Sequence, residues 1–187
     1  MTKTVMVIGV ALGAVFIAGV ILSLVAPKKI SVQSIGFINA PKQQVFDQIR
    51  FMKNFPNWSP FLRQDPEQKF TVSGNDGQVG ATFSWIGVKE KSKGSQTVVY
   101  LSGNDNLTIA CNITEPFQSN PVFAYTFKEK DGGTEVIQDF EAPMPFPSNV
   151  FGLLFGVKQR MASTNKEGLE LLKKAVERTE KVVSEAK

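Results

Sequence analysis

The chain has 187 residues but no histidine, and its single cysteine is Cys111. Without histidine it cannot build a Ser-His-Asp triad, a histidine general base, or most zinc and non-haem iron sites. One cysteine cannot form an intramolecular disulfide or a CxxC redox site. We therefore predict no metal site and no cofactor.

The chain also has little excess of positive charge outside its N-terminus. The net charge is +4, but Lys3, Lys28 and Lys29 flank the first hydrophobic run, and the remainder carries 18 basic and 17 acidic residues. A nearly neutral domain lacks the basic patch that binds phosphate backbones. We predict no nucleic-acid partner. The 42% of hydrophobic residues, including 15 phenylalanines, instead indicates a globular protein with a large apolar interior.

The long hydrophobic run extends from Val5 to Ala26 and contains 22 residues without a charge. As a helix it would be roughly 33 Å long, enough to cross a bilayer core of about 30 Å. A cleaved signal peptide is the alternative, but cleavage after Ala26 would put Leu24 where a small residue is needed. We predict a single-pass anchor in the cell membrane (inner or plasma), with residues 1–29 as anchor and flanks and 30–187 as one domain.

Positive charges around this run bear on its orientation. Lys28, Lys29 and Lys42 follow it, whereas Lys3 precedes it. By the positive-inside rule this distribution favours a cytoplasmic C-terminal domain. The sequence leaves the oligomeric state open.

The first part of the domain reads as a strand followed by two short helical segments. Residues 30–38 have alternating character, and residues 42–52 place apolar side chains at helical spacing. The segment "NFPNWSPF", residues 54–61, then combines two prolines with three aromatic rings. Proline interrupts regular structure, so this segment is a second short helix or a tight turn. Its rings either form a lid over a cavity or belong to an ordinary hydrophobic turn.

Residues 69–142 read as about six short strands. The turn signals "GNDG", "SGNDN" and "DGG" separate alternating segments of ordinary strand length. Short turns between neighbours imply antiparallel pairing.

The C-terminal part, from Val150 to about Ser184, contains no proline and predicts one long amphipathic helix, with Ser148 or Asn149 as its cap. Its apolar stripe comprises Val150, Leu154, Val157, Met161, Thr164, Gly168, Leu171 and Ala175. We therefore predict an α+β fold in which a curved antiparallel sheet of about seven strands wraps around this helix.

Several short stretches in this order resemble the START-like, or SRPBCC, superfamily with its helix-grip fold, in particular its polyketide-cyclase/dehydrase-like branch. They are "INAPKQQVFDQI", "NWSPF", "GQVGATFSWIG", "KGSQTVV", "DGGTEV" and "GLELLKK". The resemblance covers residues 30–180. It implies a hydrophobic cavity able to hold a lipid, sterol or polyketide-sized molecule, but it implies no reaction.

In a helix-grip domain such a cavity lies between the concave sheet face and the long helix. Strand alternation selects the candidate ligand-binding residues of the sheet, and the long helix supplies others. The resemblance implies that the short second helix, with Trp58 and Phe61, lies at the cavity mouth. They are Trp58, Phe61, Phe83, Trp85, Phe123, Tyr125, Phe127, Phe151, Leu154 and Met161. The alternative for each residue is a place in an ordinary packed core.

Candidate groups for catalysis are few. Asp47, Glu115, Asp139 and Glu141 could act as acids or bases, but Asp139 and Glu141 share one strand face that we expect to be solvated. Cys111 falls in an inward apolar pattern, where a thiol is a poor nucleophile. We select no catalytic residue, and whether the protein is an enzyme stays open.

Three functions remain. The first is a membrane-tethered binding or carrier domain for a hydrophobic small molecule or lipid. The second is a protein-interaction or stress-response module with a filled core. The third is a cyclase- or dehydratase-like enzyme acting on a polyketide-like substrate.

Overall fold

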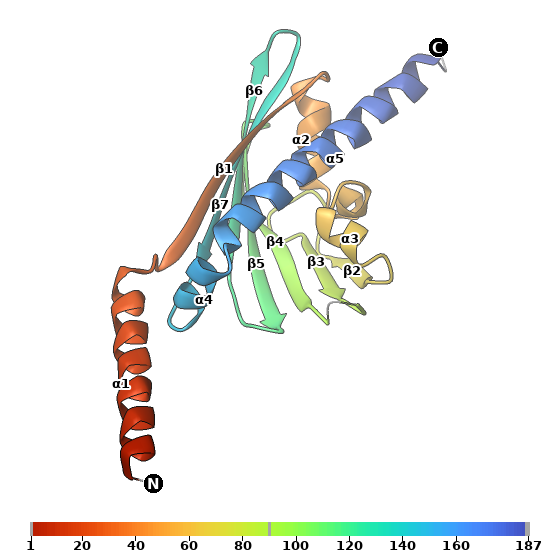
Figure 1. Cartoon of the computed structure of the whole chain (residues 1–187). Coiled ribbons are helices and arrows are strands. Elements are labelled where there is room, and N and C mark those ends of the chain that lie inside the picture. The colour runs from red at the N-terminus through yellow and green to blue at the C-terminus, as the bar shows by residue number, and fades with distance from the viewer. Residues whose placement is uncertain (1, 90, 186–187) are drawn as a thin grey trace.

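The structure is a computed structural model and describes residues 2–89 and 91–185. One apolar helix leads into a domain in which a curved sheet holds a long helix against its inner face (Figure 1). In chain order the elements are α1 (Thr2–Val25), β1 (Lys29–Ile38), α2 (Lys42–Arg50), η1 (Met52–Asn57), α3 (Pro60–Gln64), β2 (Lys69–Ser73), β3 (Thr82–Ile86), β4 (Lys93–Ser102), β5 (Asn106–Glu115), β6 (Val122–Lys130), β7 (Gly133–Pro143), α4 (Ser148–Leu154) and α5 (Val157–Glu185).

Within the described residues, seven strands form one sheet in the order β1-β7-β6-β5-β4-β3-β2. Every neighbouring pair is antiparallel, as the short turns predict. β1 leaves the chain order and pairs with β7, with Lys29 opposite Pro143 and Ile38 opposite Thr134. Together with the helix held against the inner face, this confirms the predicted α+β helix-grip fold.

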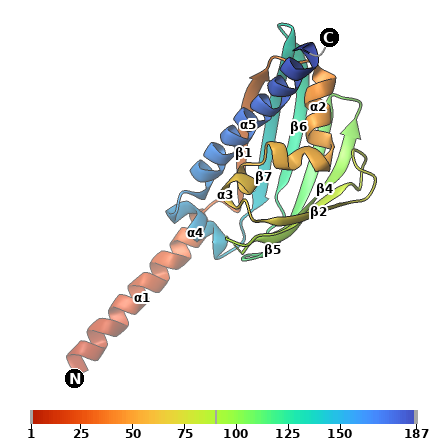
Figure 2. The ribbon, with the colours of Figure 1, turned by 90° about the vertical axis from the view of Figure 1, so that its right-hand side faces the viewer.

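Helix α5 crosses the inner face of the sheet (Figures 1 and 2). Beside it, α2 lies over β6 and β7, and η1 lies over β3. The main core forms where α2 and α5 meet the sheet. There the rings of Phe46 and Phe127 pack edge to face with centroids 5.4 Å apart. Val45, Ile49 and Leu172 are buried around them.

The prediction of a single long helix from Val150 to about Ser184 is wrong in one respect. The chain forms two helices, α4 and α5, and the break lies at Phe155 and Gly156. Gly156 has a φ of +61°, a left-handed conformation that glycine adopts readily and that ends many helices. α4 therefore leaves the line of α5.

Helix α1 makes few contacts with the domain. Its Val5–Val25 segment is long and apolar enough to cross a membrane, and none of it is buried in the protein. Signal sequences can have the same length and composition.

A link between α1 and α4 replaces the predicted side-chain cap. α4 begins without a side-chain cap hydrogen bond. Instead, the buried Asn149 amide Nδ2 donates to the carbonyl oxygens of Ser23 at 3.3 Å and Ala26 at 3.5 Å.

Candidate ligand-binding cavity

A cavity of about 300 Å³ lies between the inner sheet face and the helices α3 and α5. Its volume is roughly ten times the 30 Å³ that one water molecule takes in the liquid. Sites for small molecules begin at about this size. Its apolar lining consists of Ile30, Phe55, Phe61, Phe83, Trp85, Cys111, Ile113, Pro121, Phe123, Phe140, Ala142, Met144, Val157 and Met161. Its polar lining consists of Gln64, Asp65, Gln68, Ser92, Gln96 and Ser119.

Strand alternation places the rings of β3 in this lining. Phe83 and Trp85 point inward, and Ser84 between them points to the outer face. Trp85 lies opposite Gly94 of β4. A Cβ atom on Gly94 would lie 2.8 Å from Cζ2 of Trp85, so the glycine makes room for the indole ring. The indole N–H donates to Ser92 Oγ at 3.1 Å and fixes the ring in the wall.

Five of the ten predicted residues lie in the cavity wall. They are Phe61, Phe83, Trp85, Phe123 and Met161. Phe83 is fully buried, whereas Phe61 is 41% exposed and stands at the rim. Their contact with a ligand stays a prediction, but the structure brings all five together around one space.

Trp58 and Tyr125 line a separate small void of about 30 Å³ next to the main cavity. Trp58 packs edge to face on Phe55 with centroids 5.1 Å apart, and its indole N–H donates to the Gln48 carbonyl at 3.2 Å. These contacts hold Trp58 in place. Within "NFPNWSPF", therefore, Phe55 and Phe61 face the main cavity, and Trp58 belongs to the packing behind it.

The other three predicted residues lie away from the cavity. Phe127 is buried against Phe46 in the main core. Phe151 and Leu154 are exposed on α4 and are not in the lining. The expectation that they reach the cavity from one long helix fails because that helix is interrupted at Gly156.

Buried polar side chains surround the small void. The amide Nε2 of Gln138 donates to the hydroxyl of Tyr125 at 2.8 Å. Within the described part of the chain, Gln138 Oε1 and Asn165 Nδ2 are buried without a hydrogen-bond partner. An acceptor and a donor therefore face a space large enough for a single hydroxyl group or water molecule.

The buried thiol in the cavity wall and the buried phenol beside it are poorly suited to acid–base chemistry at neutral pH. Burial raises the pKa of the Cys111 thiol to about 12. Burial also raises the pKa of Tyr125, beside the small void. Asp65 is buried in the main lining, and its Oδ2 accepts hydrogen bonds from the backbone N–H groups of Val88 at 2.8 Å and Lys89 at 3.0 Å. This carboxylate thus fixes the loop between β3 and β4.

The four carboxylates predicted as candidate acids or bases lie outside the cavity lining. Asp139 accepts from Gln33 Nε2 at 2.8 Å, and Asp47 pairs with Arg50 Nε at 2.6 Å. Glu141 is exposed, and hydrogen bonds from Lys29 and Ser31 lower its pKa. Glu115 is the last residue of β5 and is exposed.

Sequence reasoning missed the parts of the lining that come from loops and strand ends. Asp65 follows α3, Ser119 and Pro121 precede β6, and Met144 follows β7. Neither helical nor strand periodicity identifies residues in loops or just beyond strand ends. The dense proline spacing in "PMPFPSN" was the available signal that the chain folds back at this edge.

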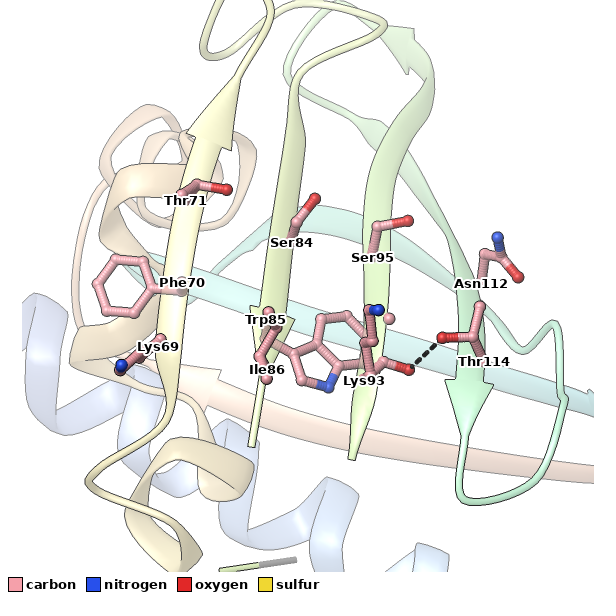
Figure 3. Close-up of a pocket in the computed structure, with 11 residues that line it drawn as sticks. Lys69, Phe70, Thr71, Ser84, Trp85, Ile86, Lys93, Ser95, Asn112 and Thr114 are labelled. Atoms are coloured by element: carbon pink, nitrogen blue, oxygen red, sulfur yellow. Dashed lines mark hydrogen bonds between the residues drawn. The ribbon is translucent and has the colours of Figure 1, made fainter. Parts of the chain in front are cut away.

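The outer face of the sheet carries a second depression of about 350 Å³ over β2 to β5 (Figure 3). Figure 3 shows hydroxyl and amide groups on its strands, and Thr114 Oγ1 donates to the Lys93 carbonyl at 3.1 Å. Lys69, Lys93 and Thr114 there are exposed. Because this depression is more open to solvent than the inner cavity and its strands carry several hydroxyl and amide groups, we regard the inner cavity as the candidate site for an apolar ligand.

Comparisons with known structures support the fold. A protein of unknown function from Staphylococcus aureus superposes with a TM-score of 0.63 at 10% identity, covering 82% of this chain and 96% of that one. An uncharacterized protein from Rhizobium leguminosarum gives a TM-score of 0.61 at 13% identity, covering 80% and 95%. A protein from Thermus thermophilus gives 0.57 at 19% identity, covering 80% and 98%. Identities this low establish the fold alone.

The sequence itself identifies the family. A comparison with curated proteins found no match. The family model described as "Polyketide cyclase / dehydrase and lipid transport" matches residues 29–177, which is most of the chain and leaves out α1. The chain therefore belongs to the polyketide cyclase/dehydrase and lipid transport family.

Proposed function

We propose that the protein is a membrane-tethered binding or carrier domain for a hydrophobic small molecule or lipid. The observation that carries this proposal is the apolar cavity of about 300 Å³ between sheet and α5. A domain that acts only through its surface does not need such a space, because protein interiors pack closely. The family description and the helix-grip fold point the same way.

The charged residues of the cavity wall limit the charge that a bound ligand can carry. Among the described residues, Asp65 is the charged residue in the lining, and neither lysine nor arginine belongs to it. An anionic headgroup buried there would lack a cationic partner, and an unpaired buried charge is costly. We therefore propose a ligand whose buried part is neutral. The polar atoms of Gln138 and Asn165 behind the wall suit a hydroxyl group, which can donate to one and accept from the other.

Helix α1 supplies the tether in this proposal. It enters the domain through Lys28 and β1, so the cavity stays near the membrane that would hold the ligand. The lysines after the run favour a cytoplasmic domain in a single-pass protein.

The decisive experiment is mass spectrometry of small molecules bound to the full chain after extraction from its native host. Ile113→Trp should fill the cavity and remove the bound ligand, because Ile113 lies in the wall. Thr114→Trp is the matched control, since Thr114 follows on the same strand and lines the outer depression. The proposal fails if the wild-type protein is reproducibly empty, or if both variants retain the same ligand.

An enzymatic role is the second candidate, because the family description includes cyclases and dehydrases and one carboxylate, Asp65, lies in the wall. Asp65→Asn would then abolish turnover of a polyketide-like substrate while the wild-type and variant bind it equally. Loss of ligand binding together with loss of folding would instead reflect the hydrogen bonds that Asp65 makes to the β3–β4 loop.

A further inference from the structure

Five large apolar side chains on and around α4 are exposed. They are Phe146, Phe151, Leu153, Leu154 and Phe155, and we call them the α4 patch. Leu154 is 61% exposed and Phe155 is 64% exposed. Single exposed apolar residues are common, but five within ten positions are not, and two of them, Phe151 and Phe155, stack with ring centroids 6.3 Å apart. Concentrations of exposed apolar side chains normally mark a site of contact with a partner or a membrane.

The position of the patch is set by α1. Asn149, buried in α4, donates to the carbonyl oxygens of Ser23 and Ala26 in the last turn of α1 and just beyond it. Figures 1 and 2 both show α4 beside the C-terminal end of α1. If α1 spans a bilayer, the patch therefore lies where the chain leaves the hydrocarbon region.

The charges near the patch suit an anionic membrane surface. Residues 142–166 contain no aspartate or glutamate. Lys158 and Arg160, at the start of α5, are both exposed and closely follow the patch in the sequence. Basic residues next to an apolar surface are attracted to anionic lipid headgroups, and the apolar side chains then enter the boundary with the acyl chains.

The inner side of α4 contacts the cavity wall. A Cβ atom on Gly152 would collide with the methyl group of Met144, so this buried glycine lets the Met144 side chain pack directly against α4. Met144 lines the cavity together with Val157, the first residue of α5. One side of α4 thus packs against Met144 of the cavity wall, and other α4 side chains form the exposed patch.

We propose that the α4 patch is a membrane-docking surface that seats the edge of the cavity on an anionic bilayer, so that the ligand passes between cavity and membrane without crossing water. The inference rests on the proposed function, because it requires α1 to span the membrane. It adds a second point of membrane contact, and two of its five residues, Phe151 and Leu154, are ones that the sequence pattern assigned to the ligand site.

The test uses the full chain in vesicles of phosphatidylcholine and phosphatidylglycerol, with an environment-sensitive fluorophore on one introduced cysteine. The native Cys111 is buried and will not compete for the label. Leu154→Cys reports on the patch, Ile17→Cys reports on α1, and Lys128→Cys, exposed on β6, is the matched control. Lipids with a spin-label quencher near the headgroup or deep in the acyl chain give the depth.

The expected result is quenching at Leu154→Cys by the shallow quencher, at least about twofold above the control, and quenching at Ile17→Cys by the deep one. Without quenching at Ile17→Cys, the tether and the proposed function fail. If Ile17→Cys is quenched but Leu154→Cys behaves like Lys128→Cys, this inference alone fails. A Leu154→Cys label that is shielded from both water and lipid quencher also overturns it, because another protein surface then covers the patch.

A second set of variants separates docking from simple proximity. In a Phe155→Cys reporter, Phe151→Ser with Leu154→Ser should reduce shallow quenching to the control level, and vesicles without phosphatidylglycerol should weaken it. Val79→Ser with Val99→Ser removes two exposed apolar residues elsewhere and should leave it unchanged. Equal shallow quenching of the Phe155→Cys reporter alone, with the two patch substitutions, and with the two control substitutions would contradict the proposal.

Discussion

The two ends of the space between α5 and the sheet are built differently. At the end near α2, Phe46, Phe127 and Leu172 are almost completely buried and fill the space. At the end near α4, Met144, Val157 and Met161 are only partly buried and border the cavity. The same helix thus provides stability at one end and room for a ligand at the other.

The largest expected effect contrasts these two ends. Phe127→Ala should lower the free energy of unfolding by about 3–5 kcal/mol, because it leaves a cavity in a packed core. Met161→Ala should cost less than about 2 kcal/mol, because its side chain already borders an empty space. Urea unfolding of the full chain in detergent gives both values. Equal losses would mean that the ends are packed alike.

A smaller effect is expected at the boundary between the ends, where Gln138 donates to Tyr125. Tyr125→Phe should cost about 1–2 kcal/mol, because it leaves the Gln138 amide buried without an acceptor. In a Gln138→Leu background the same change should cost less, since that amide is already absent. A double-mutant cycle measures the difference, and strict additivity would show that the pair contributes nothing.

At the end of the space near α4, the left-handed backbone conformation of Gly156 can be tested separately. Gly156→Ala should lower stability by about 1 kcal/mol, because alanine is strained at a φ of +61°. Gly132, which also has positive φ but lies in the β6–β7 turn away from the cavity, is the control position. We expect only Gly156→Ala to change ligand release, since only that residue sets the angle between α4 and α5. Altered release in the Gly132→Ala variant would remove this distinction.

The smallest expected effect on stability concerns Glu141, on β7 at the end of the space near α4. The pKa of Glu141 is lowered from its ordinary value of 4.5, mainly by the hydrogen bonds from Lys29 and Ser31. A carboxylate whose pKa is lowered by folding stabilises the folded state at pH values above its ordinary pKa. This contribution is lost as the pH falls through the pKa of the folded state. Lys29→Gln should therefore flatten the stability profile slightly below pH 4.5. An unchanged acid profile would show that solvent screens the pair completely.

The sequence was most informative for strands whose alternating pattern leaves one face buried and the other exposed. Alternation placed Phe83, Trp85 and Phe123 in the cavity wall, because neighbouring strand residues must face opposite sides. It could not show that Phe127, at the same phase as Phe123, faces packed core instead. That difference depends on α2 lying over one part of the strand and not the other.

Helical spacing was a less exact guide. The predicted stripe included Gly168 and Ala175, which are buried, but Leu169, Leu172 and Val176 beside it are buried too. One residue turns a helix by about 100°, so a broad contact face cannot be resolved from spacing alone. The break at Gly156 was recognisable in principle, since a glycine after "LLF" is a common helix end.

The pairing of β1 with β7 has a mechanical consequence. The strand that follows the anchor is ten residues long and is hydrogen-bonded along its length to the last strand of the chain. Tension between the membrane and the far end of the domain would pull β1 lengthwise along its neighbour. All the bonds of the ladder would then bear the load at once, so the domain should withstand traction on its anchor far better than a strand peeled away one pair at a time.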